Sequence, residues 1–168
     1  MKKCKISPAT LARTAALALA QAGCRVTVCA RTPEKAAALA ARCGGVTVSW
    51  EDLPRAAAEH GLLLNATPLG MEGSPEFESL DFVQALPAKA VVYDLVYHPT
   101  DTALMRAAEY RGLTAVGGLA LLVQQAALSF AHFTGIVPDA ALCRDILQEL
   151  EAAQQGGGCR FRKKCKKI

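Results

Sequence analysis

Two basic residues follow the first predicted strand, where their charges could recognise a phosphate. Arg31 comes directly after the apolar segment 25–30, and Lys35 stands one helical turn further on. In a dinucleotide-binding fold this position lies beside the adenosine ribose, where an acidic residue would bind a free 2′-hydroxyl and an arginine suits a 2′-phosphate. The pair therefore favours NADP over NAD, unless both side chains are ordinary solvated surface charges.

A second polar group follows the short apolar segment 62–64. Asn65 and Thr67 lie in the sequence Asn-Ala-Thr-Pro-Leu-Gly-Met, at the end of a predicted strand. Their side chains could bind a ribose or a substrate hydroxyl there. Asn and Pro are also turn formers, so a purely structural turn explains the same residues.

The next strand end, 93–99, contains Asp94 and Tyr97, which we expect as polar residues of a cleft. His98 precedes a proline in a loop, so we expect it to be exposed and do not assign it as a general base. Further on, Gly117 and Gly118 would permit a close backbone approach to a ligand. Gln125 lies in an apolar helical segment, and a bound polyhydroxy substrate could satisfy its amide.

These residues are positioned by an alternation of helix and strand, which predicts an α/β fold with a Rossmann-like, doubly wound parallel sheet in a single domain. Such a sheet binds ligands at the carboxyl ends of its strands. Strands are predicted over 25–30, 46–48, 62–64, 90–95 and 114–116, and helices over 9–22, 33–41, 51–58, 102–111, 119–133 and 139–153. Residues 65–80 are predicted to form a loop.

Composition sets the broad class. The 168 residues are 52% hydrophobic and 20% charged, as in globular proteins, and no apolar run is long enough for a membrane span or a signal peptide. We therefore expect a cytoplasmic protein without membrane contact. Scarce aromatic residues predict a core of small aliphatic side chains and argue against base-stacking platforms for nucleic acid.

The charges are unevenly distributed along the chain. Nine of the 19 Lys and Arg residues lie in 2–5 and 160–167, which leaves 10 basic and 15 acidic residues between 6 and 158. We predict an atypical segment at 1–8, a dinucleotide-binding domain at 9–153 and a disordered basic tail at 154–168. Binding of nucleic acid or acidic lipid by the tail is a weaker alternative.

The seven cysteines are an odd number and have no zinc-ligand spacing, so we predict no metal site. Cys24, Cys29 and Cys43 stand in apolar segments and should be buried, reduced thiols. Three other cysteines, near the chain ends, are predicted to be exposed: Cys4, Cys159 and Cys165.

Four motifs occur in the order and spacing of one family: Ala-Arg-Thr-Pro-Glu-Lys at 30–35, residues 65–71, Asp-Leu-Val-Tyr-His-Pro-Thr at 94–100 with Thr102, and 118–130 followed by Thr-Gly at 134–135. Over 11–150 the chain resembles the C-terminal, NADP-binding domain of shikimate dehydrogenase. The resemblance implies an oxidoreductase that reduces 3-dehydroshikimate to shikimate with NADPH, on the pathway to aromatic amino acids.

The resemblance also assigns roles to individual residues. The 2′-phosphate would be held by Arg31, Thr32 and Lys35. The cofactor cleft would be lined by Asn65, Ala66 and Thr67, and the nicotinamide would lie against Gly118 and Leu121. Tyr97 and Gln125 would reach the substrate.

Two departures from the family pattern weaken this assignment. The family's glycine-rich turn, Gly-Ala-Gly-Gly-Ala-Ala-Arg, aligns with 7–13, where every glycine is replaced and Pro8 has no N–H for a phosphate. A loss of ~2 to 3 kcal/mol would lower cofactor affinity by several tens-fold. The family's N-terminal substrate domain, with its catalytic Lys and Asp, has no counterpart here, so no catalytic residue is carried over.

Two functions therefore remain open. The chain could be the cofactor domain of a shikimate dehydrogenase, inactive alone and able to meet a substrate only if a substrate domain is supplied. It could instead be a non-catalytic binding or interaction module on a Rossmann scaffold. A homodimer is possible, and the sequence does not separate shikimate from quinate as the substrate.

Overall fold

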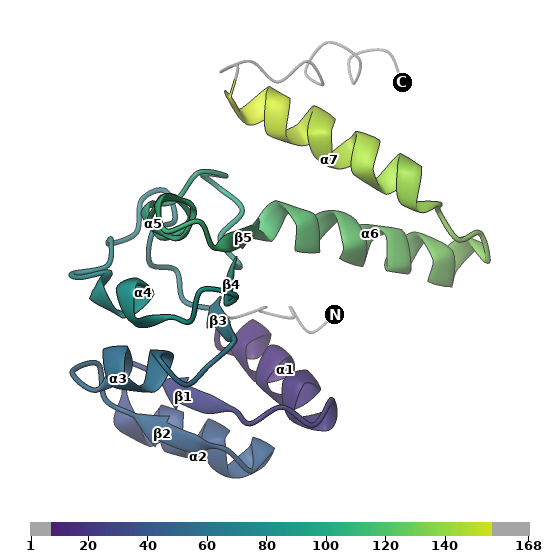
Figure 1. Ribbon diagram of the computed structural model, residues 1–168. Coiled ribbons are helices and arrows are strands. Elements are labelled where there is room, and N and C mark those ends of the chain that lie inside the picture. Colours follow the sequence, from purple (N-terminus) through teal and green to yellow (C-terminus); the bar gives the residue numbers. More distant parts are fainter. Residues whose placement is uncertain (1–7, 156–168) are drawn as a thin grey trace.

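A computed structural model describes residues 8–155, in which parallel strands alternate with helices as the sequence predicts (Figure 1). The strands are β1 (Thr27–Cys29), β2 (Val46–Val48), β3 (Leu62–Asn65), β4 (Val91–Asp94) and β5 (Thr114–Gly117). The helices are α1 (Pro8–Gln21), α2 (Pro33–Cys43), α3 (Leu53–Ala57), α4 (Asp81–Ala85), α5 (Ala103–Tyr110), α6 (Gly118–Thr134) and α7 (Ala140–Gln155). The α/β class is confirmed. Residues 1–7 and 156–168 lie outside the described residues. Pro8 belongs to α1 and residues 154–155 belong to α7, so the predicted bounds 1–8 and 154–168 are wrong at these positions.

Local signals explain most element ends. Pro33 starts α2, and Gly44 ends it at φ 63°, a left-handed conformation in which its N–H bonds to the Ala40 carbonyl. Thr102 caps α5, because its hydroxyl accepts a hydrogen bond from the Met105 N–H. Helix α4 was not predicted from the sequence, because its five residues are too few to show a helical period.

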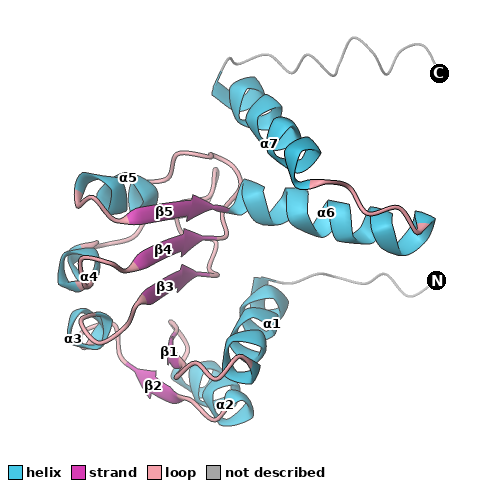
Figure 2. Cartoon of the chain, turned by 45° about the vertical axis from the view of Figure 1, so that its right-hand side comes forward, coloured by secondary structure: helices cyan, strands magenta, loops and turns pink. Residues whose placement is uncertain are grey.

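The parallel sheet is divided into two fragments, which the sequence analysis did not predict. One fragment contains β1 and β2, and the other has the order β3-β4-β5. Figure 2 shows the interval between β3 and the β1–β2 fragment. The regular alternation of elements predicted one sheet, but it carries no information on whether neighbouring strands meet.

The main core lies in the β3–β5 fragment. It combines Val92 of β4 with apolar residues of the short helices and loops beside that strand. These are Ala57, Phe82, Val83, Leu86, Ala90, Leu104, Ala108 and Leu113. Around β1 and β2, the buried side chains of α1 and α2 are alanines: Ala16, Ala36 and Ala40. The predicted core of small aliphatic residues is thus most complete around β4.

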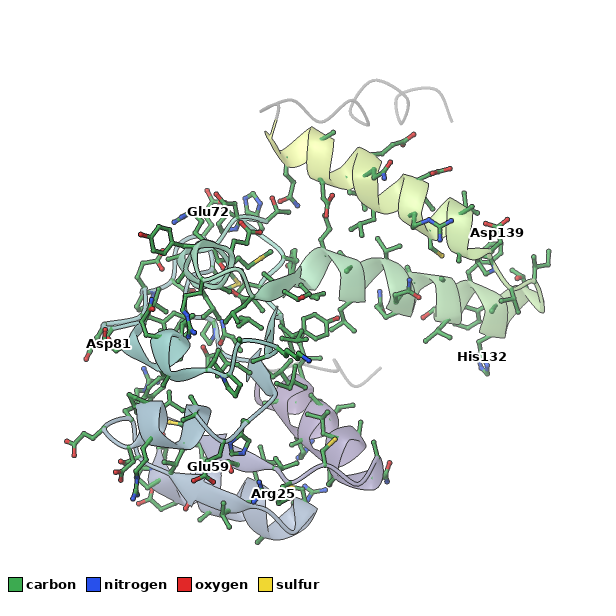
Figure 3. The ribbon with its side chains drawn as sticks, in the orientation of Figure 1. Arg25, Glu59, Glu72, Asp81, His132 and Asp139 are labelled. Carbon is green, nitrogen blue, oxygen red and sulfur yellow. The ribbon has the colours of Figure 1, made fainter. Side chains whose placement is uncertain are left out.

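The last two helices form a hairpin that projects from the sheet (Figure 1). Only the first residues of α6 are buried, including Leu119 and Val123. Eight large apolar side chains of α6, the turn and α7 are exposed: Leu122, Leu128, Phe130, Phe133, Ile136, Val137, Leu142 and Ile146. Figure 3 labels His132 and Asp139 near the hairpin tip. None of the helices in 8–155 is long and apolar enough to cross a bilayer.

A candidate nucleotide site at the carboxyl ends of the strands

Three strand ends lie side by side in the β3–β5 fragment. The register pairs Asn65 of β3 with Asp94 of β4, and Asp94 with Gly117 of β5. Residues that the sequence analysis selected from distant segments therefore meet at one edge of the sheet, as expected for parallel strands.

Asp94 is the centre of a buried polar network at this edge. Its side chain is 0% exposed. One carboxylate oxygen accepts from the Asn65 amide at 2.8 Å and from the Val96 N–H at 3.1 Å, and the other accepts from the Thr102 hydroxyl at 2.7 Å. The prediction of Asp94 as a cleft residue is wrong, because both of its oxygens are bonded inside the protein.

Asn65 forms an asparagine turn rather than a side chain open to a ligand. Its carbonyl oxygen accepts from the Thr67 N–H at 3.0 Å and from the Thr67 hydroxyl at 2.7 Å. Its amide donates to the Leu69 carbonyl at 3.2 Å as well as to Asp94. The structural turn considered for this segment is therefore present, and it holds Ala66 and Thr67 half-buried at the strand edge.

Thr102 belongs to this network, although from the sequence it was named only as a helix start and as part of a family motif. Its hydroxyl donates to Asp94 and accepts from the Met105 N–H at 3.2 Å, so one side chain joins the strand end to the N-terminus of α5. An Asp at a strand end followed by a Thr at a helix start was the available signal.

Gly118 is required by the protein's own backbone. A Cβ at this position would overlap the Leu95 carbonyl oxygen and lie 2.8 Å from the Val96 carbonyl carbon. The Gly118 N–H donates to the Val96 carbonyl at 3.1 Å. The close approach predicted for a ligand is thus made by the loop that follows β4, and contact of Gly118 with a nicotinamide stays a prediction.

The cations that follow β1 remain accessible. Arg31 and Lys35 are exposed, and none of the ion pairs within 8–155 involves either of them. Thr32 is the N-cap residue of α2, yet its hydroxyl makes no capping hydrogen bond. These three side chains are free to bind an anion as far as the described residues show.

The two predicted substrate contacts are both exposed. Tyr97 is 51% exposed in the loop after β4, where its carbonyl accepts from the Gln154 amide at 3.3 Å. Gln125 is exposed on α6, so the prediction that its amide needs a bound partner is wrong. Leu121, one turn earlier, is half-buried.

A cavity of about 330 Å³ lies beside the strand edge, between the loop 70–76 and the segment His98–Pro99. Glu72 and Glu76 line it, and Glu72 forms an ion pair with His98. Figure 3 labels Glu72 on the β3–β5 fragment, whereas Arg25, which precedes β1, lies at the opposite end of the view. Two carboxylates make this cavity unsuitable for a phosphate. His98 is exposed, as predicted.

The segment aligned with the family's glycine-rich turn is helical. Helix α1 begins at Pro8 and continues through Arg13, and Ser7 lies outside the described residues. A proline has no N–H to offer a phosphate at this position. The departure from a phosphate-binding turn stays a prediction.

The cysteines are less buried than predicted. Cys24 is exposed, Cys29 and Cys43 are half-buried, and Cys143 is buried. Burial raises the pKa of the Cys29 thiol. Cys4, Cys159 and Cys165 lie outside the described residues. Within 8–155, no three His, Cys, Asp or Glu residues are close enough together to hold a metal ion.

Comparison with known proteins relates these features to one family. Residues 118–148 match the model of the shikimate 5′-dehydrogenase C-terminal domain. The chain is 46% identical over 141 residues to the shikimate dehydrogenase (NADP(+)) of Acidiphilium cryptum, which covers 83% of this chain and 50% of the relative. The enzyme of Methylocella silvestris is 45% identical over 129 residues, with coverage of 76% and 45%.

Solved structures give the same result. Shikimate 5-dehydrogenase from Thermus thermophilus, in complex with NADP(H) and shikimate, aligns with a TM-score of 0.65 at 36% identity over 79% of this chain and 49% of that chain. Quinate dehydrogenase from Corynebacterium glutamicum, in complex with NAD, gives 0.70 at 29% identity over 82% and 51%. The chain spans about half the length of the relatives it matches. It is therefore a relative of the shikimate dehydrogenases, similar to their C-terminal domain.

Proposed function

We propose that this chain is a nucleotide-binding half of an NADP-dependent dehydrogenase. The observation that carries the proposal is the group formed by Arg31, Thr32 and Lys35 at the carboxyl end of β1, which is accessible and has no ion-pair partner within 8–155. An arginine fork with a neighbouring ammonium suits a dianionic 2′-phosphate. Relatives named as NADP(+) enzymes support this reading.

The cofactor cleft in this proposal runs along the strand edge from β1 to β5. Ala66 and Thr67 contribute to it through the shape of their turn, which the Asn65 and Asp94 network fixes. Asn65 acts by positioning that turn, because its own polar atoms are already bonded. Gly118 and Leu121 would border the nicotinamide at the start of α6.

For the reaction, we infer hydride transfer between NADPH and a cyclic hydroxy acid of the shikimate or quinate type. Tyr97 and Gln125 would orient that substrate from one side. A ketone reduction also needs an acid–base group, and His98 is engaged with Glu72. The proposal therefore assigns the acid–base group to a substrate domain, and this chain alone would bind cofactor without turnover. The four described cysteines are free thiols, in agreement with a reducing cytoplasm.

Calorimetric titration with NADPH and with NADH tests the proposal. We expect NADPH to bind more tightly, and Arg31→Ala to weaken NADPH binding by roughly 10- to 100-fold while NADH binding stays unchanged, because a charged hydrogen-bonded pair is lost. Arg42→Ala is the matched control, since Arg42 lies in the last turn of the same helix. Equal affinity for both nucleotides, or no binding of either, would contradict the assignment and favour a non-catalytic module.

A further inference from the structure

The hairpin of α6 and α7 meets the rest of the domain at both of its ends. The first residues of α6 are buried. At the other end, Gln154 of α7 contacts the loop that follows β4. Figure 1 shows α7 running back from the hairpin tip toward the side on which α5 lies. Within 140–154 only Cys143 is buried, so few apolar contacts fix α7, and the polar contact at its end bears on its position.

The Gln154 amide contacts two consecutive residues of that loop. Its nitrogen donates to the Tyr97 carbonyl at 3.3 Å, and its oxygen lies 3.4 Å from Nδ1 of His98. A reversed amide would bring the oxygens of Gln154 and Tyr97 together, and neither of them can donate. The Tyr97 carbonyl therefore fixes the amide with its oxygen toward the His98 ring.

The second ring nitrogen of His98 also faces an acceptor. Nε2 forms the ion pair with the carboxylate of Glu72, which Figure 3 labels. The backbone holds these two segments together as well, because the Glu72 N–H donates to the His98 carbonyl at 3.1 Å. A neutral imidazole has one N–H and one lone pair, whereas an imidazolium has two N–H groups. The ring can donate to both of its acceptors only when His98 carries the second proton.

The other ionisable groups around this contact come from three elements: Glu76 from the cavity wall, Glu151 from α7, and Asp101 of the loop in its pair with Arg106 of α5. Among these residue types, histidine alone ordinarily changes its charge between about pH 5 and 8. A change of the contact in this range of pH therefore reports the protonation of His98.

We propose that Glu72, His98 and Gln154 form a proton-dependent latch between α7 and the loop after β4. In the closed latch the imidazolium donates to Glu72 and to Gln154, and the end of α7 is held against the loop. When Nδ1 loses its proton to water, Nε2 keeps the proton that it donates to Glu72, and a lone pair on Nδ1 faces the Gln154 oxygen. The latch is therefore closed at acidic pH and opens as the pH rises. Because Tyr97 lies in the same loop, opening also removes the restraint on its carbonyl.

Hydrogen exchange of the full chain without nucleotide, read by mass spectrometry at about pH 5.5 and about pH 8, tests the latch over the range in which histidine titrates. Labelling times are scaled for the ordinary pH dependence of amide exchange. We expect the peptide 148–154 to exchange several-fold more slowly at the lower pH, because a docked helix end opens less often. The peptide 126–133 of α6 is the internal reference and should show no such difference.

Two variants assign the effect to the latch. His98→Phe keeps a planar ring but has no N–H, and Gln154→Ala removes the amide. In both variants we expect 148–154 to exchange at the faster rate at both pH values. His132→Phe is the matched control, because His132 is an exposed histidine in the last turn of α6, and it should keep the full difference. Circular dichroism checks that the variants fold.

The possible results separate clearly. Equal scaled rates for 148–154 at the two pH values in the unchanged chain would overturn the latch. A difference that survives in His98→Phe or in Gln154→Ala, or one that disappears in His132→Phe, would overturn its assignment to these residues. A difference that is lost in both latch variants and kept in the control supports the proposal. Since no nucleotide is present, the result is independent of the NADPH titration.

Discussion

The two sheet fragments of this chain are built from the same kinds of elements, but they are packed to different degrees. In the β3–β5 fragment, Val83, Val92 and Ala108 are all 0% exposed. In the β1–β2 fragment no strand residue is buried, and Val46 is 63% exposed. Within 8–155, β4 pairs with a strand on each side and β1 pairs with β2. Among the described residues, the complete core therefore lies around the strand with two described neighbours.

The polar groups of the two fragments differ in a related way. At the end of β4, Asp94 is fully bonded within the protein and fixes the Asn65 turn. At the end of β1, Arg31 and Lys35 remain exposed. The well-packed β3–β5 fragment holds an internal polar network that shapes a loop. The β1–β2 fragment instead presents its charges to solvent, where a ligand can reach them.

The largest effect on this comparison should come from Asp94→Ala. The change removes the acceptor for three hydrogen bonds and leaves buried donors of Asn65, Thr102 and Val96 without a partner, so we expect a loss of about 3 to 5 kcal/mol in the free energy of unfolding. Urea denaturation measures it. Asp101→Ala, which breaks an exposed pair with Arg106, should cost under about 1 kcal/mol. Similar losses in the two variants would refute the central role of the network.

A second test concerns the contact between α6 and the loop after β4. Gly118→Ala places a Cβ against the Leu95 and Val96 backbone, and we expect a loss of about 2 to 3 kcal/mol from overpacking. Gly61→Ala is the control, because a Cβ there meets nothing within 4 Å. Thermal denaturation compares the two. A neutral Gly118→Ala would show that this junction is not tightly packed.

Much of this arrangement was predictable from the sequence. The alternating apolar segments and the Pro and Gly residues at their ends predicted every strand and all helices except α4. The cations after β1 were also identified, since charge directly after a strand is a local pattern. The direction of a polar side chain was not predictable: Asp94 points inward because Thr102, eight residues away, completes its hydrogen bonds. The exposure of Gln125 and Cys24 likewise depends on which tertiary neighbours are present.

The division of the sheet was the least predictable feature. Apolar strand sequences show that a strand forms, but they do not show which strand lies beside it. Val26–Cys29 has the composition of a buried central strand, and it lacks a second neighbour within 8–155.

A matched pair of substitutions measures the difference between the fragments directly. Val92→Ala removes methyl groups from a fully buried strand residue and should cost about 2 kcal/mol, whereas Val28→Ala at half-buried β1 should cost under about 1 kcal/mol. Urea denaturation of both variants gives the comparison. Equal costs would mean that the two fragments are equally packed.

The smallest expected effect is on the thiol of Cys29 in β1. Burial raises its pKa in the folded chain, so the thiolate is disfavoured there. The stability that this residue contributes is present below the pKa of the unfolded state and is lost as the pH rises through the higher folded value. Near pH 8.5, an ordinary thiol value, iodoacetamide should therefore modify Cys29 several-fold more slowly than exposed Cys24, as read by peptide mass mapping. The ratio should narrow at higher pH and vanish in urea. Equal rates for Cys29 and Cys24 near pH 8.5 would show that burial does not protect the Cys29 thiol.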